Sequence, residues 1–180
     1  MVTAFFLARS ATICLEASVL TGLAEIRSCE DARTACRRLL DGGVNAAVVK
    51  LGANGVVVMA LDKEPVHIPG HKVRAVDTTA AGDAFGAALA VGIVDGLDPV
   101  ESAVFANAAA ALSVQRPGAQ SSMPSRAEVD AFFQGFASLF DPPLGRAHSM
   151  AYHGSITRGA RRQFVRETRQ AVGRAVSASD

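Results

Sequence analysis

The most informative segment of the chain reads Val73-Arg74-Ala75-Val76-Asp77-Thr78-Thr79-Ala80-Ala81-Gly82-Asp83-Ala84-Phe85. A short run containing β-branched residues ends at Asp77, small residues follow, and an apolar stretch begins at Ala84. This order predicts a strand, a tight turn and a buried helix. Unpartnered N–H groups and the helix dipole would let such a turn bind phosphate. The alternative is an ordinary strand-to-helix turn capped by Asp77 or Thr79.

The segment from Asp77 to Asp83 resembles the signature of the ribokinase (PfkB-type) carbohydrate kinases. Further resemblances follow the family's order at Glu16 to Gly22, Leu51 to Gly55, Phe105 to Ala111 and Arg116 to Gln120. The similarity runs from about Glu16 to Phe133 and corresponds to roughly the C-terminal half of a ribokinase. It implies an α/β, ribokinase-like fold with a mostly parallel sheet and helices on both faces, truncated at the N-terminus.

The resemblance also implies roles for individual residues. Asp83 would be the general base that takes the proton from a sugar hydroxyl, and the N–H groups from Ala80 to Asp83 would form an anion hole. The nucleotide contacts implied are Lys50, Leu51, Gly52, Ala53, Asn54, Gly55, Ala80, Ala81, Gly82 and Asn107. A monovalent cation would be held by Asp77, Thr79, Ser113, Arg116, Gly118 and Ser122, and Glu16 would belong to the magnesium environment.

Four of these residues also have an ordinary structural interpretation. Glu16 could be a solvated glutamate that caps a helix. Lys50 could be a solvated lysine at a strand end instead of a phosphate contact. Asn107 lies in an all-small helical stretch and needs a partner, which could be a nucleotide or a backbone carbonyl. Asp77 could form an Asx turn, which is compatible with cation binding.

The activity implied by the resemblance is transfer of the γ-phosphoryl group of ATP to a sugar, most simply D-ribose, with Mg²⁺ and K⁺ as cofactors. Members of the family form homodimers. Nothing in residues 1–15 resembles the family's sugar-binding half, so we expect weak nucleotide binding and negligible ribose phosphorylation. The alternatives are a non-catalytic nucleotide-binding or interaction module and a kinase for another substrate, such as vitamin B6 or a nucleoside.

Composition limits the class of protein. The chain has 180 residues, of which 49% are hydrophobic and 19% charged, so a packed core is possible. A net charge of +1 and 6% aromatic residues argue against nucleic-acid binding. The three cysteines form no C-x-x-C motif, which favours a reducing setting. No apolar run reaches the roughly 18 residues that a membrane span needs, so we expect a cytoplasmic protein without a membrane partner.

The remaining elements follow from periodicity and capping signals. Helical spacing over Glu30–Asp41 follows a capping box at Ser28 and Asp31 and ends at Gly42-Gly43. Other predicted elements are strands at 2–8, Ala46–Lys50 (buried and parallel), Gly55–Leu61 and Val66–Ile68, and helices at Ala84–Val94, Val100–Val114 and 126–137. The last helix begins with a capping box at Ser125 and Glu128. The predicted division is a kinase part, residues 1–140, and a basic tail, residues 141–180.

Overall fold

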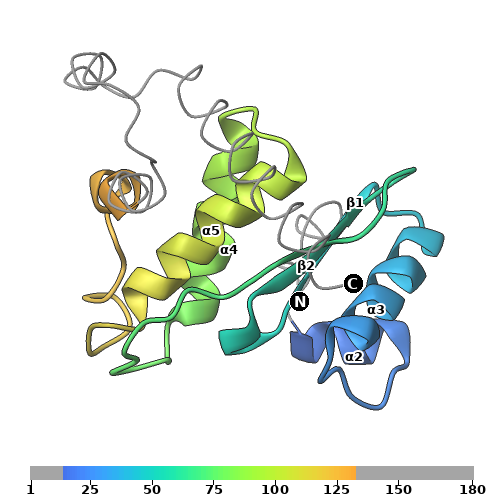
Figure 1. Ribbon diagram of the computed structural model, residues 1–180, viewed down its shortest axis with the longest axis horizontal. Helices are drawn as coiled ribbons and strands as arrows, with labels where there is room; N and C mark the ends of the chain where they lie inside the picture. The colour runs from blue at the N-terminus through green and yellow to red at the C-terminus, as the bar shows by residue number, and fades with distance from the viewer. Residues whose placement is uncertain (1–13, 133–180) are drawn as a thin grey trace, which may run out of the picture. The chain divides into compact units, whose positions relative to one another are not determined.

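The computed structural model describes residues 14–132 of the chain. The chain divides into two compact units, Met1–Met123 and Pro124–Asp180. The described elements of the first unit are α2 (Cys14–Thr21), α3 (Cys29–Asp41), β1 (Ala46–Lys50), the 3-10 turn η1 (Gly52–Asn54), β2 (Val56–Ala60), β3 (Val66–Ile68), α4 (Ala81–Val94) and α5 (Pro99–Ser113). Their order and types agree with an α/β fold (Figure 1).

The three described strands form one sheet in the order β1-β2-β3. Both pairs are antiparallel, with Val48 opposite Val58 and Val56 opposite Ile68. The predicted strand at Ala46–Lys50 and its burial are confirmed. The predicted parallel pairing, and with it the mostly parallel sheet, is wrong for the described strands. Only residues 51–55 join β1 to β2, and only residues 61–65 join β2 to β3. Connections this short reverse the chain, whereas a parallel pair needs a crossover of a dozen or more residues.

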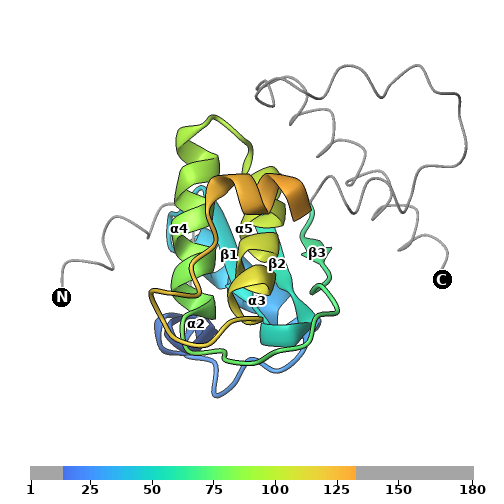
Figure 2. The same ribbon diagram turned by 90° about the vertical axis from the view of Figure 1, so that its left-hand side faces the viewer.

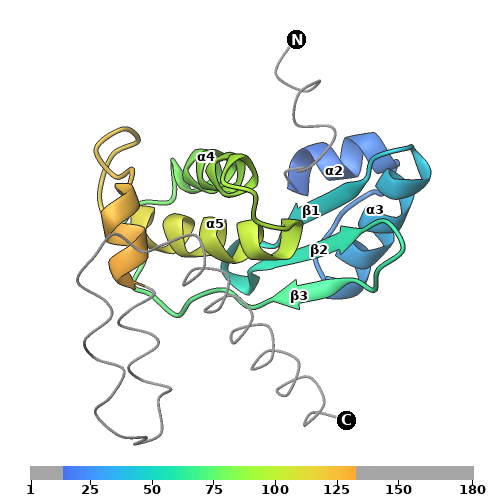
Figure 3. The same ribbon diagram turned by 90° about the horizontal axis from the view of Figure 1, so that it is seen from above.

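Helices cover both faces of this sheet, as predicted. Helices α2 and α3 lie on one side of the strands, and α5 lies on the other (Figure 3). Alternate strand residues such as Val49 and Val57 join Ala32, Ala35 and Cys36 in one buried cluster on the α3 side. Because side chains alternate along a strand, the equally buried Val48, Val56 and Val58 point towards the opposite face. Burial on both faces explains why these strands are apolar at almost every position.

Helices α4 and α5 lie side by side (Figure 2). Every residue from Ser102 to Ala109 of α5 is buried, so the small side chains of this helix pack closely. At the contact, a Cβ atom on Gly92 would lie 3.0 Å from Cα of Ser102. The small residues of this region therefore set how closely the two helices approach.

The helix ends follow the capping signals. Ser28 and Asp31 form a reciprocal capping box at the start of α3, and Gly42 follows its last residue, as predicted. Asp98 and Glu101 form a second box at the start of α5, which sequence reasoning missed. In contrast, α4 begins after Ala80 without a side-chain cap. The helix begins at Ala81, three residues before the predicted start at Ala84.

The segment that precedes α4 is not a strand. The backbone N–H groups of Val76 and Asp77 both donate to the carbonyl oxygen of Val114, at 2.7 and 3.1 Å. Val114 is the residue that caps the C-terminus of α5, so neither bond pairs this segment with a neighbouring strand. The predicted strand ending at Asp77 is thus an irregular segment tied to the end of α5.

In the second unit, Ser125 and Glu128 form the predicted capping box, with Ser125 N–H 2.7 Å from Glu128 Oε2. Residues 126–132 are helical. The rest of the predicted helix to 137, the boundary at 140, the basic tail and the strand at 2–8 lie outside the described residues. Within residues 14–132, no helix has the length and apolar character that a membrane crossing requires.

Candidate functional site

The first turn of α4 presents a carboxylate beside free backbone donors. Asp83 lies in this turn, as predicted, and its side chain is exposed. Ala81 N–H donates to Thr78 O, and Ala84 N–H starts the helical ladder by donating to Ala80 O. Within residues 14–132, no hydrogen bond is described for the N–H groups of Gly82 and Asp83, so both are open to an anion. Ala80 itself is buried.

Lys50 brings the end of β1 to the start of α4. Its Nζ atom lies 3.5 Å from the carbonyl oxygen of Gly82 and 5.4 Å from the centre of the Phe85 ring. A Cβ atom on Gly82 would approach this Nζ to 3.3 Å, so glycine leaves room for the ammonium group. The positive charge of Lys50 thus lies next to the positive end of the α4 dipole, which favours a bound anion.

The loop from Gly52 to Gly55 is a tight connection with an exposed backbone. Leu51 N–H donates to Gly55 O at 2.7 Å, and Asn54 N–H donates to Leu51 O at 3.1 Å. Gly52 and Gly55 have φ angles of +59° and +88°, which side-chain-bearing residues rarely adopt. Gly52, Ala53 and Asn54 are exposed. A ligand could therefore approach the backbone of this loop closely.

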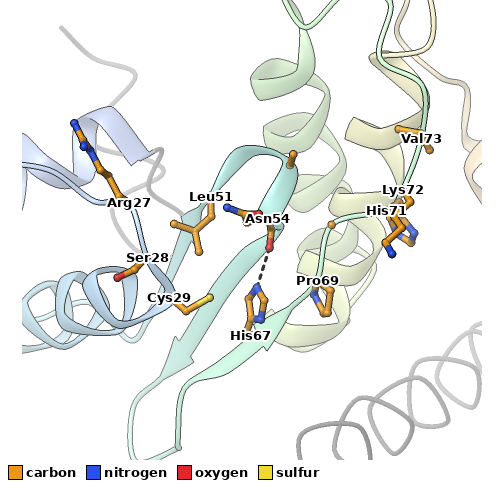
Figure 4. A pocket seen from close by; sticks show the side chains of 12 residues that line it. Arg27, Ser28, Cys29, Leu51, Asn54, His67, Pro69, His71, Lys72 and Val73 are labelled. Atoms are coloured by element: carbon orange, nitrogen blue, oxygen red, sulfur yellow. Dashed lines mark hydrogen bonds between the residues drawn. The ribbon is translucent and has the colours of Figure 1, made fainter. Parts of the chain in front are cut away.

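A cleft of about 790 Å³ opens beside this loop (Figure 4). Its lining includes the predicted Leu51, Ala53 and Asn54. Sequence reasoning missed the other two walls, which are Arg27 to Cys29 and the segment from His67 to Val73 without Ile68. The lining contains four basic side chains and no acidic one; these are Arg27, His67, His71 and Lys72. Burial lowers the pKa of His71, so its imidazole favours the neutral form.

One wall of the cleft is anchored by Asn107. Its Nδ2 atom donates to the carbonyl oxygen of Pro69 at 2.8 Å, and its side chain is buried. Of the two partners considered from the sequence, the structure therefore shows the backbone carbonyl. A signal was present in the sequence, because a buried asparagine in an apolar helix must be bonded, but the sequence cannot name the partner.

Asp77 is the centre of a second cluster. Its Oδ1 atom accepts from the hydroxyl and the N–H of Thr79 at 2.6 and 2.9 Å, and its Oδ2 atom accepts from Gly118 N–H at 2.9 Å. These three bonds, led by that of the Thr79 hydroxyl, lower the pKa of Asp77 to about 2. The Asx turn considered from the sequence is present, and Asp77 is held as a carboxylate.

The other predicted cation ligands lie around the turn that leads to Gly118. The carbonyl oxygen of Ser113 accepts from Arg116 N–H at 3.2 Å. The buried Ser122 hydroxyl donates to Ala119 O at 3.0 Å. The structure thus brings Asp77, Thr79 and Gly118 into direct contact. Ser113 lies at the end of α5, where its hydroxyl donates to Ala110 O, and Ser122 bonds within the loop that follows. Glu16 lies in α2, and residues 14–132 contain no group of three His, Cys, Asp or Glu side chains suited to a metal.

The sequence of this chain is similar to those of characterised sugar kinases. A ribokinase of Haemophilus influenzae is 39% identical over 119 residues, which cover 66% of this chain and 38% of that protein. A deoxyribokinase of Salmonella typhi is 40% identical over 110 residues, 61% of this chain and 35% of that protein. The chain therefore spans less than two fifths of the length of these relatives.

Solved structures give the same result. An Arabidopsis thaliana ribokinase complexed with ribose and ATP aligns with a TM-score of 0.62 and 36% identity, over 68% of this chain and 39% of that one. A structure from E. coli, assigned provisionally as a ribokinase II and bound to ATP and Mg²⁺, aligns with a TM-score of 0.59 and 29% identity, over 69% and 38%. These neighbours support the α/β, ribokinase-like fold class.

A family model described as pfkB family carbohydrate kinase matches residues 15–126, a range that contains the Gly52 loop, the start of α4 and the Asp77 cluster. The chain belongs to the pfkB family of carbohydrate kinases.

Proposed function

We propose that the first unit binds ATP and carries the phosphoryl-transfer site of a sugar kinase that converts D-ribose and ATP to ribose 5-phosphate and ADP. The observation that carries the proposal is the exposed carboxylate of Asp83 in a helix turn that has free N–H donors and Lys50 beside it. Asp83 would accept the proton of the attacking hydroxyl. Gly82 N–H, Asp83 N–H and Lys50 would stabilise negative charge on the transferring group.

ATP would lie along the Gly52 to Gly55 loop, with its phosphates towards the start of α4. The exposed loop backbone, the neighbouring cleft and the short distance from Lys50 to Gly82 support this placement. Two structural neighbours were solved with ATP, one of them with Mg²⁺. Mg²⁺ would be bound mainly by phosphate oxygens and water, with Glu16 of α2 in its surroundings.

A monovalent cation, K⁺ in this proposal, fits the donor set around Asp77. The carboxylate is ionised, and Oδ2 accepts only the Gly118 bond among those described, so it retains a lone pair. The surrounding hydroxyl and carbonyl groups are the hard oxygen ligands that such ions prefer. The proposed ligands are Asp77, Thr79, Ser113, Arg116, Gly118 and Ser122. A cation here would stiffen the turn that precedes Asp83 without contacting the sugar.

Ribose is the proposed sugar, and 2-deoxyribose is the main competitor. A ribokinase and a deoxyribokinase resemble this chain at 39% and 40% identity, so both sugars belong in the assay. Cys29 and Cys36 are free thiols, which suits a reducing compartment. We therefore place the proposed reaction in the cytoplasm.

The test uses the 180-residue chain with ATP, Mg²⁺ and K⁺, and measures ATP binding and sugar-dependent ADP release separately. The chain spans less than two fifths of its relatives' length, so the wild type should bind ATP weakly and release little ADP with ribose. Asp83→Asn should keep ATP binding and abolish any sugar-dependent release, because loss of a proton acceptor typically costs about 10²- to 10⁴-fold in rate. Asp62→Asn is the matched control: Asp62 is exposed in the β2–β3 turn with φ of +58°, which asparagine also adopts.

The outcomes separate the two classes of function considered from the sequence. Release that depends on ribose and on Asp83 supports the kinase. ATP binding without release by the wild-type chain supports a non-catalytic nucleotide-binding module. A chain that does not bind ATP contradicts the kinase and the nucleotide-binding module, and leaves the interaction module.

A further inference from the structure

His67 is bonded to the loop that is proposed to receive ATP. Its Nε2 atom lies 2.8 Å from the carbonyl oxygen of Asn54 (Figure 4). A carbonyl oxygen can only accept, so Nε2 must carry the hydrogen and the imidazole is the donor. His67 pairs with Val57 across the β2–β3 ladder, and Val57 belongs to the buried cluster on the α3 side. The His67 ring therefore lies on the same side of the sheet as the cleft that it lines.

The opposite side of the loop is already fixed by backbone contacts. A Cβ atom on Gly55 would collide with the carbonyl oxygen of Ile68, and one on Gly70 would collide with Ala53. The Pro69–Gly70 segment is in turn bonded to α5 through Asn107. This leaves the exposed residues Gly52 and Asn54 as the part of the loop for which these close backbone contacts do not account. The bond from His67 reaches this part.

We propose that His67 is a positioning residue that holds the Gly52–Gly55 loop in the conformation that binds ATP; the inference rests on the proposed function. A loop with glycines at both ends has many accessible backbone conformations. If only a fraction of molecules has the competent loop, the apparent dissociation constant rises in inverse proportion to that fraction. A hydrogen bond that orders the loop beforehand therefore increases nucleotide affinity without contacting the nucleotide.

Two substitutions at one position separate this role from simple packing. His67→Leu keeps a side chain of moderate size and removes the donor. His67→Gln keeps an amide N–H at a similar reach from the backbone. Lys63→Ala is the control, since Lys63 is exposed in the β2–β3 turn and belongs to neither the cleft nor the loop.

The first measurement is hydrogen exchange at the amides of Asn54 and Gly55, which donate to Leu51 and Gly52. The second is the dissociation constant of ATP with Mg²⁺ by calorimetry. One neutral hydrogen bond is worth about 0.5–1.5 kcal/mol, so His67→Leu should speed exchange and weaken ATP binding about 2- to 12-fold. His67→Gln and Lys63→Ala should stay near the wild type in both measurements.

The inference is overturned if His67→Leu exchanges like the wild type, or if exchange accelerates while ATP affinity stays the same. It is also overturned if His67→Gln behaves like His67→Leu, because loss of the hydrogen-bond donor would then not explain the faster exchange and the weaker ATP binding. A wild-type chain that fails to bind ATP refutes the proposed function and the nucleotide part of this inference. The exchange data, recorded without ATP, still decide whether His67 holds the loop.

Discussion

Gly118 donates its backbone N–H to Oδ2 of Asp77 over 2.9 Å, although the two residues are 41 positions apart in the chain. The bond joins the loop after α5 to the turn before α4. The N–H and hydroxyl groups of Thr79 donate to the other carboxylate oxygen, Oδ1. The side chain of Asp77 therefore fixes the backbone on both sides of this junction. Asp83 lies just beyond this junction, in the first turn of α4.

Asp77 should make the stability of the fold depend on acid pH. Its pKa is lowered to about 2 in the folded chain, against about 3.9 in an unfolded one. A lowered folded-state pKa stabilises the fold fully above about pH 4, and this contribution is lost as the pH falls towards 2. Asp77→Asn should therefore have a lower Tm than the wild type at pH 7, and the difference should shrink between about pH 4 and pH 2.

Thermal unfolding monitored by circular dichroism checks this prediction, with Asp62→Asn as the control carboxylate. A Tm difference between Asp77→Asn and the wild type that is constant from pH 7 to pH 2 would show that the ionised form is not responsible.

Gly55 and Gly52 should respond differently to alanine, although both have positive φ angles. The left-handed conformation alone costs a residue with a side chain about 1–2 kcal/mol, and this is the whole expected cost of Gly52→Ala, whose Cβ would meet nothing within 4 Å. Gly55→Ala adds a collision with the backbone of Ile68 and Gly70, so its total cost should reach about 3 kcal/mol or more. Urea unfolding of both variants gives the comparison, and equal losses would contradict the close contact at Gly55.

Gly92 and Gly86 form a second pair within α4. Alanine at Gly86 would meet nothing within 4 Å and should stabilise the chain by about 0.5–1 kcal/mol through helix propensity. Alanine at Gly92 would lie about 3.0 Å from Cα and Cβ of Ser102 and should instead destabilise by about 1–3 kcal/mol. Urea unfolding of the two variants tests this prediction, because the free energy of unfolding should rise for Gly86→Ala and fall for Gly92→Ala. Stabilisation by Gly92→Ala would mean that α4 and α5 can move apart without cost.

Cys36 should be inert towards alkylation in the folded chain. Its side chain is buried, and burial raises its pKa to about 12. The reactive thiolate would then be on the order of 10⁻⁴ of the population at pH 8. Treatment with iodoacetamide followed by peptide mass spectrometry should label Cys29, which lines the cleft, before Cys36. In urea the two should react alike; early labelling of Cys36 under native conditions would refute the burial argument.

Much of the local structure could be predicted from the sequence because its causes are local. The box of Ser28 and Asp31 and the glycines after Asp41 set the ends of α3. The apolar run after Gly82 predicted α4, and its position after a turn of small residues placed Asp83 in a first helical turn. These signals act between residues a few positions apart, so they can be recognised in the chain itself.

The predictions that failed concern contacts between distant residues. The apolar run Ala46–Lys50 predicts burial on both faces, but burial does not specify the direction of the neighbouring strand. The run that ends at Asp77 predicts an extended chain, yet its N–H groups bond to Val114 instead of a strand. The cleft walls from Arg27 to Cys29 and from His67 to Val73 come from segments that periodicity does not relate.

The sequence by itself determined the helices α3, α4 and α5, the capping box of α3, the glycine loop, the turn that carries Asp83 and the resemblance to the family, because each is encoded within a short window of residues. The tertiary structure alone decided the antiparallel pairing of the sheet, the carbonyl partner of Asn107, the junction of Asp77 with Gly118 and the bond from His67 to Asn54. Each of these depends on which surfaces pack together once the whole core is buried, and a hydrogen-bonding side chain does not specify its distant partner in advance.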